Sequence, residues 1–165
     1  MLGRARQQGA ASVELALLLM LVLVPILFGV FEVGRAMFYY NTLVKAARDA
    51  ARIMTIQAPG GAGYAGLKAD ATCAAWSDLT TKEKDPCTSP LLPGLTSNMV
   101  VICDAVNSVA CPGKQHAAVE TGSGVVNLVT VSIGAANNPY VYTPVVPILP
   151  TFNFGPISVT MRQVL

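Results

Sequence analysis

Residues 15–31 read LALLLMLVLVPILFGVF, a stretch without a charged side chain. Together with Ala10 to Val13 before it, this apolar run approaches the roughly 20 residues that a helix needs to cross a bilayer. A buried core helix is the alternative, but a soluble domain within a chain of 165 residues could hardly surround such a helix on all sides. The sequence therefore predicts a membrane-inserted helix.

The helical pattern continues past the apolar run through AMFYYNTLVKAARDAARIMT, residues 36–55. No small-x-small motif closes the run, which argues against a cleaved secretory signal. We expect one helix from Ala10 to Met54, on the order of 65 Å long, with about half of it outside the hydrocarbon layer. Pro25 should kink it or open it locally. The segment from Pro59 to Gly63 should end it.

Alanines recur at helical spacing in the second half of this helix, where Ala46 pairs with Ala50 and Ala47 with Ala51. Such small side chains let a second helix approach closely. The alternative is a stem helix that packs against its own head domain, and the pattern is compatible with both.

A short leader, residues 1–9, precedes the helix; it contains Arg4 and Arg6 and ends in Gly9. Glu14 follows five residues later, at the start of an otherwise uncharged membrane helix. A carboxylate costs about 2.5–3.5 kcal/mol at the bilayer centre on insertion scales and less near its edge. Glu14 is therefore either an ordinary interfacial carboxylate or a charge that needs a partner.

This N-terminal pattern resembles that of type IV prepilins and, more closely, the TadE-like family of tight-adherence pilus proteins. The residues that carry the resemblance are RQQGAASVELALLL, Pro25, FGVFEVGRAMFYYNTLVKAARDAAR and the C-terminal ISVTMRQVL. Residues 48–52 depart mildly from the family, which often has a glycine there. The resemblance implies that a prepilin peptidase cuts between Gly9 and Ala10. It also implies that Glu14 meets the Ala10 amine of a neighbouring subunit.

The same resemblance implies a structural role as a minor pilin or pseudopilin that supports pilus assembly and surface adhesion. Its partners would be the membrane, prepilin peptidase, other pilin-like subunits and the pilus assembly machinery. The alternative is a permanently membrane-anchored extracytoplasmic binding domain without a filament role. Only the first function requires Gly9 and Glu14.

Glu32 and Arg35 lie three residues apart on one helix face just after the apolar run. They form either an ion pair at the outer membrane interface or two separately solvated charges.

The four cysteines all follow the apolar run, at Cys73, Cys87, Cys103 and Cys111. None forms a CxxC pair and His116 is the only histidine, whereas a zinc site normally takes four N or S ligands that often include a closely spaced pair. Disulfides are the better interpretation, and they place the head in an oxidising compartment. Three pairings are open; closeness in sequence favours Cys73–Cys87 and Cys103–Cys111.

The oxidising compartment also sets the expected orientation. Lys and Arg residues flank both ends of the span, so their count does not favour either side. We place the N-terminus in the cytoplasm and the head outside it, because long domains can cross regardless of charge. The expected location is the inner membrane, with display on the cell surface after assembly.

Residues 55–165 predict a small α+β head: a short helix, an antiparallel β-sheet and disulfides. We expect the helix at 67–79, a polar loop at 80–90, and strands at 99–103, 125–133 and 157–161, the last two with alternating apolar residues. The prolines between the last two strands exclude a central strand there. Tyr140, Tyr142 and Phe152 in that connection either form a contact surface or cap their own sheet.

No motif in the sequence indicates an enzymatic function. Gly61, Gly63 and Gly66 formally match GxGxxG, but this segment follows a helix and a proline, so we interpret it as a hinge. His116 lies in a loop-like stretch without a catalytic motif around it. The net charge of +2 without a basic stripe argues against nucleic acid. We expect no catalytic residue, cofactor, metal or small-molecule substrate.

Overall fold

The computed structural model describes residues 4–78, 87–107, 111, 113–135, 137–146 and 149–163. Most of the expected polar loop at 80–90 lies outside these residues. The short helix that we expected to end at Leu79 ends at Trp76, where Ser77 is already extended. The chain divides into two compact units, one formed by Met1–Phe38 with Pro144–Pro150 and the other by Tyr39–Thr143 with Thr151–Leu165.

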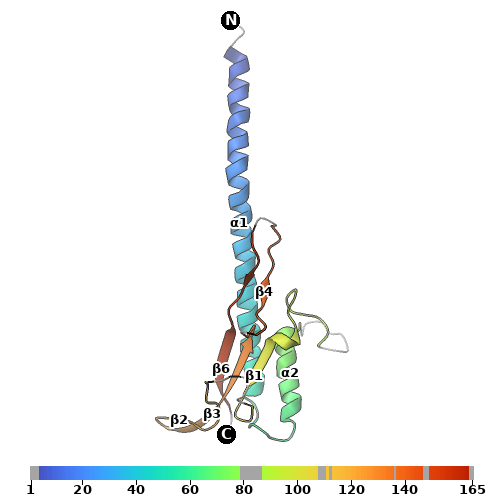
Figure 1. Cartoon of the computed structure of the whole chain (residues 1–165), viewed down its shortest axis with the longest axis vertical. Coiled ribbons are helices and arrows are strands. Elements are labelled where there is room, and N and C mark those ends of the chain that lie inside the picture. Colours follow the sequence, from blue (N-terminus) through green and yellow to red (C-terminus); the bar gives the residue numbers. More distant parts are fainter. Residues whose placement is uncertain are drawn as a thin grey trace. The chain divides into compact units, whose positions relative to one another are not determined.

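The first unit is built on helix α1 (Arg4–Met54), which continues into the second unit. The helix ends at Met54 as expected, but it begins at Arg4, so the leader residues from Arg4 to Gly9 are helical as well. It also runs through Pro25 without a break in helical structure (Figure 1). Proline removes only one N–H from the helical ladder, and the expected local opening is not observed.

In its described residues, the second unit combines the end of α1 with one further helix, a short 3₁₀ turn and six strands (Figure 1). These elements are α2 (Tyr64–Trp76), the 3₁₀ turn η1 (Ser97–Met99), β1 (Val100–Cys103), β2 (Val119–Thr121), β3 (Gly124–Ile133), β4 (Val141–Tyr142), β5 (Phe152–Asn153) and β6 (Ile157–Gln163). The long helix followed by antiparallel sheets confirms the predicted α+β class.

Strand β3 organises the larger sheet, because β1, β2 and β6 all pair with it in antiparallel fashion. Along β6 the register runs from Ile133 opposite Ile157 to Asn127 opposite Gln163. Val129, Val131 and Ile133 are buried, which confirms the core face that alternation in the sequence predicts.

Helix α2 and the short strands β2, β4 and β5 differ from expectation. Helix α2 begins at Tyr64, three residues before Leu67, directly after Gly63 in a left-handed conformation with φ 84°. A residue without Cβ adopts this conformation readily, so the chain turns into the helix there. Strand β2 lies in a stretch expected to be a loop, and β4 with β5 forms a separate two-stranded hairpin inside the proline-rich connection.

The core of the second unit contains the alanine face of α1. Ala47, Ala50 and Ala51 are fully buried and share a cluster with α2 and the sheet. Their small side chains thus serve close packing inside this chain, which favours the stem-helix alternative over a helix-helix contact with another subunit.

The aromatic residues of the connection also pack inward. Tyr140 and Tyr142 are 2% and 0% exposed, and the Tyr142 ring lies 5.5 Å from that of Tyr39. Only Phe152 keeps a large exposed surface. The alternative in which all three aromatic side chains form a contact surface is therefore wrong, because Tyr140 and Tyr142 are buried in the core of this domain.

Candidate functional site: the membrane helix and its exit

The first half of α1 presents its apolar side chains outward on all sides. Met20, Leu21 and Val30 are each about two thirds exposed or more, and the apolar window of the candidate span has none of its residues buried. Burying such side chains is worth roughly 1.5–3 kcal/mol each, so water is an unfavourable environment for this surface. The one described helix long and apolar enough to span a bilayer fits a single-pass membrane protein.

Gly9, Ala10 and Glu14 all lie on exposed helix positions near the start of this span. A Cβ added at Gly9 would meet no atom within 4 Å. Helical glycine costs about 1 kcal/mol relative to alanine, so the fold of this chain does not explain its presence. Gly29 and Gly34 share this open surrounding. Gly9 is distinguished from them by the basic leader before it and by Glu14 after it.

A buried carboxylate marks the point where the apolar run ends. Glu32 is 3% exposed; its Oε1 lies 3.5 Å from Arg35 Nη1 and accepts a hydrogen bond of 3.0 Å from the backbone N–H of Val145. Both partners stabilise the ionised carboxylate, which offsets part of its desolvation cost. The pair of charges is thus accompanied by a third group, which the sequence did not indicate.

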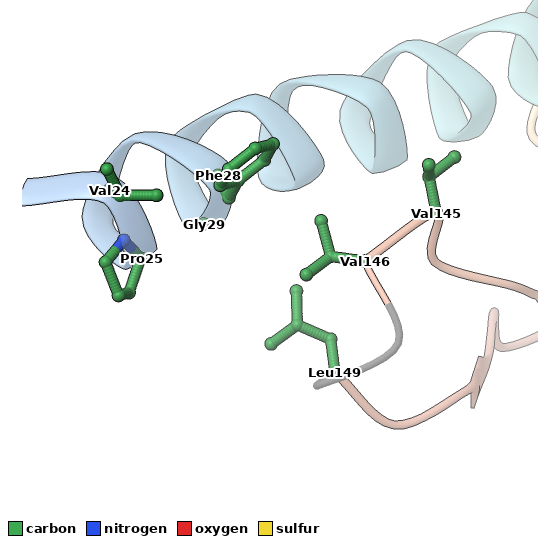
Figure 2. A pocket seen from close by; sticks show the side chains of 7 residues that line it. All are labelled: Val24, Pro25, Phe28, Gly29, Val145, Val146 and Leu149. Atoms are coloured by element: carbon green, nitrogen blue, oxygen red, sulfur yellow. The ribbon is translucent and has the colours of Figure 1, made fainter. Parts of the chain in front are cut away.

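The segment that supplies this N–H lines an apolar cavity of about 500 Å³ against the helix (Figure 2). Its lining residues are Val24, Pro25, Phe28, Gly29, Val145, Val146 and Leu149. No polar side chain takes part, so the cavity suits an apolar occupant such as a hydrocarbon chain or an apolar side chain.

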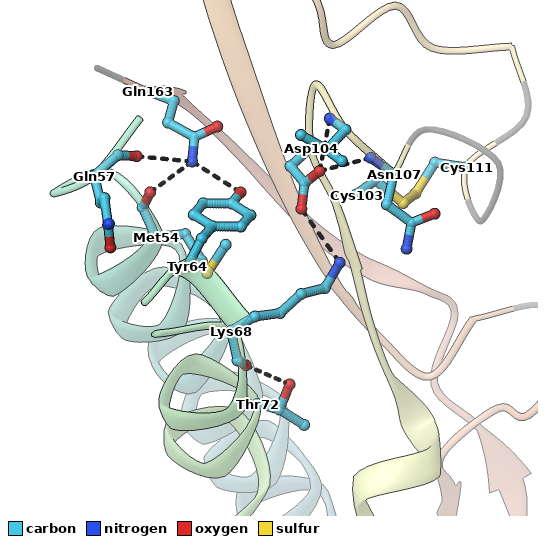
Figure 3. A network of polar contacts seen from close by, with 11 residues as sticks. Met54, Gln57, Tyr64, Lys68, Thr72, Cys103, Asp104, Asn107, Cys111 and Gln163 are labelled. Carbon is cyan, nitrogen blue, oxygen red and sulfur yellow. Dashed lines mark hydrogen bonds and ion pairs between the residues drawn. A yellow bond between two sulfur atoms is a disulfide. The ribbon is translucent and has the colours of Figure 1, made fainter. Parts of the chain in front are cut away.

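A polar network closes the end of α1 in the second unit (Figure 3). The buried Gln163 Nε2 donates to the Met54 carbonyl at 2.9 Å and to the Gln57 carbonyl at 3.2 Å, and it lies 3.0 Å from the Tyr64 hydroxyl. Helix ends leave carbonyl groups without intrahelical donors. Gln163 supplies such a donor from β6. Burial raises the pKa of the Tyr64 hydroxyl to about 12, so Tyr64 is neutral at physiological pH.

Asp104 is the second buried group of this region (Figure 3). Its carboxylate accepts hydrogen bonds from the backbone N–H groups of Asn107 and Val106 and lies 3.2 Å from Lys68 Nζ. Burial alone would raise the pKa of this carboxyl. The N–H donors and the Lys68 ammonium outweigh burial, so the pKa lies below its ordinary value.

Disulfides join Cys73 to Cys87 and Cys103 to Cys111, with Cα atoms 5.4 and 6.1 Å apart. These are the two pairings that closeness in sequence favours, and both distances lie in the ordinary range.

His116 is 2% exposed, and its Nε2 lies 2.9 Å from Thr130 Oγ1 of β3. Its backbone lies in an irregular stretch, as expected, but its side chain is buried against the sheet. Among the described residues, no group of three or more His, Cys, Asp or Glu is placed to hold a metal ion.

The glycine-rich segment lies between α1 and α2 and not between a strand and a helix. Dinucleotide binding through GxGxxG requires the strand–turn–helix arrangement. Gly63 directly precedes helix α2, which begins at Tyr64 and not at Leu67 as expected. The element before the glycines, however, is the end of α1 and not the strand that the dinucleotide motif requires. The segment is a helix–helix connection.

The described residues fit a class of single-pass membrane proteins in which one long apolar helix is followed by an α+β domain with disulfides. Residues 9–52 match the family model described as TadE-like protein. This helical segment is therefore TadE-like, which confirms the resemblance in its sequence. The match does not extend to residues 157–165 or the rest of the head. Neither a curated protein nor a solved structure matches the chain.

Proposed function

We propose that this protein is a structural subunit, a minor pilin or pseudopilin, of a tight-adherence (type IVc) pilus system. The observation that carries the proposal is a TadE-like helix whose apolar first half is largely exposed, with Gly9 and Glu14 at its start. A TadE-like helix suggests a pilus-associated, pilin-like protein with a structural and not an enzymatic role. An uncovered helix of this kind is suited to pack against other subunits.

In this proposal, Gly9 serves processing and Glu14 serves assembly. Prepilin peptidase cuts after Gly9 and frees the amine of Ala10. In the assembly, the Glu14 carboxylate of one subunit meets the Ala10 amine of a neighbour, and the two charges are desolvated together. Removing one of a buried pair leaves the other uncompensated, which typically costs 3–5 kcal/mol. An isolated anchor would have no use for a carboxylate in this place.

The proposed orientation has the N-terminus in the cytoplasm and the head outside the inner membrane. The two disulfides of the head support it, because they persist in an oxidising compartment. From there the subunit associates with other pilin-like subunits and the assembly machinery, and it reaches the cell surface with the pilus.

The N-terminus of the mature protein tests the first step. Mass spectrometry of the protein isolated from its own cells should find Ala10 as the first residue. A bulky substitution, Gly9→Phe, should leave a precursor nine residues longer. Wild-type mature protein that begins at Met1 or Leu2 would contradict the processing step.

Glu14→Gln tests the second step. Membrane insertion and cleavage should persist, because the apolar run and the leader are unchanged. Co-purification with pilin partners and the number of pili should fall strongly. Glu120→Gln, at an exposed glutamate of β2, is the matched control. A permanently anchored binding domain predicts no difference between the two variants, so normal piliation in Glu14→Gln cells would favour that alternative.

A further inference from the structure

The segment Pro144–Pro150 reads PVVPILP and contains no polar side chain. It belongs to the compact unit of the membrane helix, although more than a hundred residues separate it from that helix in sequence. Val145 is 68% exposed and Leu149 is 40% exposed. We propose that its described residues, 144–146 and 149–150, enter the bilayer leaflet on the head side and lie there beside α1 in contact with acyl chains.

The depth of the segment follows from the length of the apolar run. Residues 10–31 form about 33 Å of helix, and the hydrocarbon layer is about 30 Å thick. The run is therefore just long enough to cross, and Pro25 and Phe28 must lie inside the hydrocarbon. Leu149 lines the same cavity as Pro25 and Phe28, so it lies at the same depth (Figure 2).

The backbone of the segment is suited to this environment. An N–H without a partner in lipid costs several kcal/mol, which normally excludes non-helical chain. Pro144, Pro147 and Pro150 carry no N–H. The N–H of Val145 donates to Glu32, and that of Leu149 donates to the Val146 carbonyl at 3.1 Å. The sequence and the fold thus remove most of the donors that lipid would leave unsatisfied.

Glu32 fixes the segment at the membrane boundary. Its carboxylate lies at the first charged position after the apolar run and holds the Val145 N–H at 3.0 Å. From this point the segment extends toward Pro25, and Figure 2 shows Val146 and Leu149 directed toward the helix. The cavity between them is lined by apolar groups alone, and it shares Val24 and Pro25 with a second apolar hollow farther along α1. An acyl chain is its expected occupant.

Photocrosslinking tests the lipid contact. The full chain, with p-benzoylphenylalanine in place of Val145 or separately of Leu149, is reconstituted at low density in phosphatidylcholine–phosphatidylethanolamine vesicles and irradiated. Replacing the Val145 side chain leaves its N–H available to Glu32. The matched control is the same amino acid at Val106, a head-domain valine that is 66% exposed. Residues 145 and 149 contact acyl chains in the proposed arrangement, whereas Val106 lies in the head domain, so lipid adducts at 145 or 149 should exceed those at 106 by about tenfold.

Lipid-adduct yields at both positions equal to that at Val106 would overturn the inference. Adducts exclusively to a second copy of the chain would also overturn it, because the segment would then be a subunit contact. The inference rests on the membrane insertion in the proposed function, which alkaline carbonate extraction checks separately. Release of the protein by carbonate would contradict both the membrane insertion and the lipid contact of the segment. Retention of the protein without lipid adducts would contradict the lipid contact alone.

Discussion

The carboxylate of Glu32 and the backbone N–H of Val145 form a 3.0 Å hydrogen bond across 113 positions of the chain. One partner lies at the end of the apolar helix segment, and the other begins a proline-rich segment without polar side chains. Hydrogen bonds to charged groups contribute about 1.5–3 kcal/mol. This contact therefore contributes to holding the segment against the helix.

Glu32→Ala should release the segment. Hydrogen–deuterium exchange in the peptide that contains Val145 should rise by about 10- to 100-fold for the protein in detergent micelles, as a loss of 1.5–3 kcal/mol implies. Glu32→Gln keeps an acceptor oxygen and should have a smaller effect. Glu120→Ala removes an exposed glutamate from β2 and serves as the control. Unchanged exchange in Glu32→Ala would mean that other contacts hold the segment.

Gln163→Ala should destabilise the head domain. The Met54 and Gln57 carbonyls lose a buried donor, and each polar group left unsatisfied costs about 1–3 kcal/mol. We expect a loss of about 2–3 kcal/mol in the free energy of unfolding, measured by denaturant titration with the fluorescence of Trp76. Arg162→Ala, at the exposed neighbouring position, should change it by less than about 0.5 kcal/mol. Equal effects of the two variants would refute the capping role.

Stability should fall in acid because of Asp104. The pKa of this carboxyl is lower in the folded protein than its unfolded value of about 3.9. Its contribution is therefore fully present well above pH 4 and is lost as the pH falls through the folded pKa. Unfolding measured between about pH 6 and pH 3 should show a shallower dependence in Asp104→Asn than in wild type. Asp70→Asn, at an exposed position of α2, should retain the wild-type dependence.

Both disulfides should be present in the native head. Alkylation under denaturing, non-reducing conditions should label no thiol. Replacing both cysteines of either pair by serine should lower the free energy of unfolding by about 2–3 kcal/mol, because each disulfide closes a loop, with sequence separations of 14 and 8, that restricts the unfolded chain. Labelling of all four cysteines in protein taken from cells would contradict the oxidising compartment.

Local patterns in the sequence were sufficient for the main elements. The uncharged run and the following helical spacing predicted α1 through Met54, and alternation of apolar residues predicted β3 and β6. The short strands β2, β4 and β5 have two or three residues each, too few for a period to be recognised. The start of α2 was missed because a left-handed glycine, and not a capping side chain, precedes it.

Only part of the candidate site could be recognised from the sequence. Gly9, Glu14, Glu32 and Arg35 are recognisable because charge and glycine are unusual within or beside an apolar helix. Val145 and Gln163 carry no such signal, since each contributes through a contact with a residue more than a hundred positions away. A single sequence contains no direct information about such pairs.

The contact between Gln163 and Met54 can form only late in the synthesis of the chain. Met54 and Gln163 are 109 positions apart, and ribosomes add about 5–20 residues per second, so roughly 5–20 s of elongation separate the two. The apolar half of α1 has left the ribosome long before its cap is made. The end of α1 therefore lacks its Gln163 donor until residue 163 has been made, and a chain arrested before that point would keep an uncapped helix end.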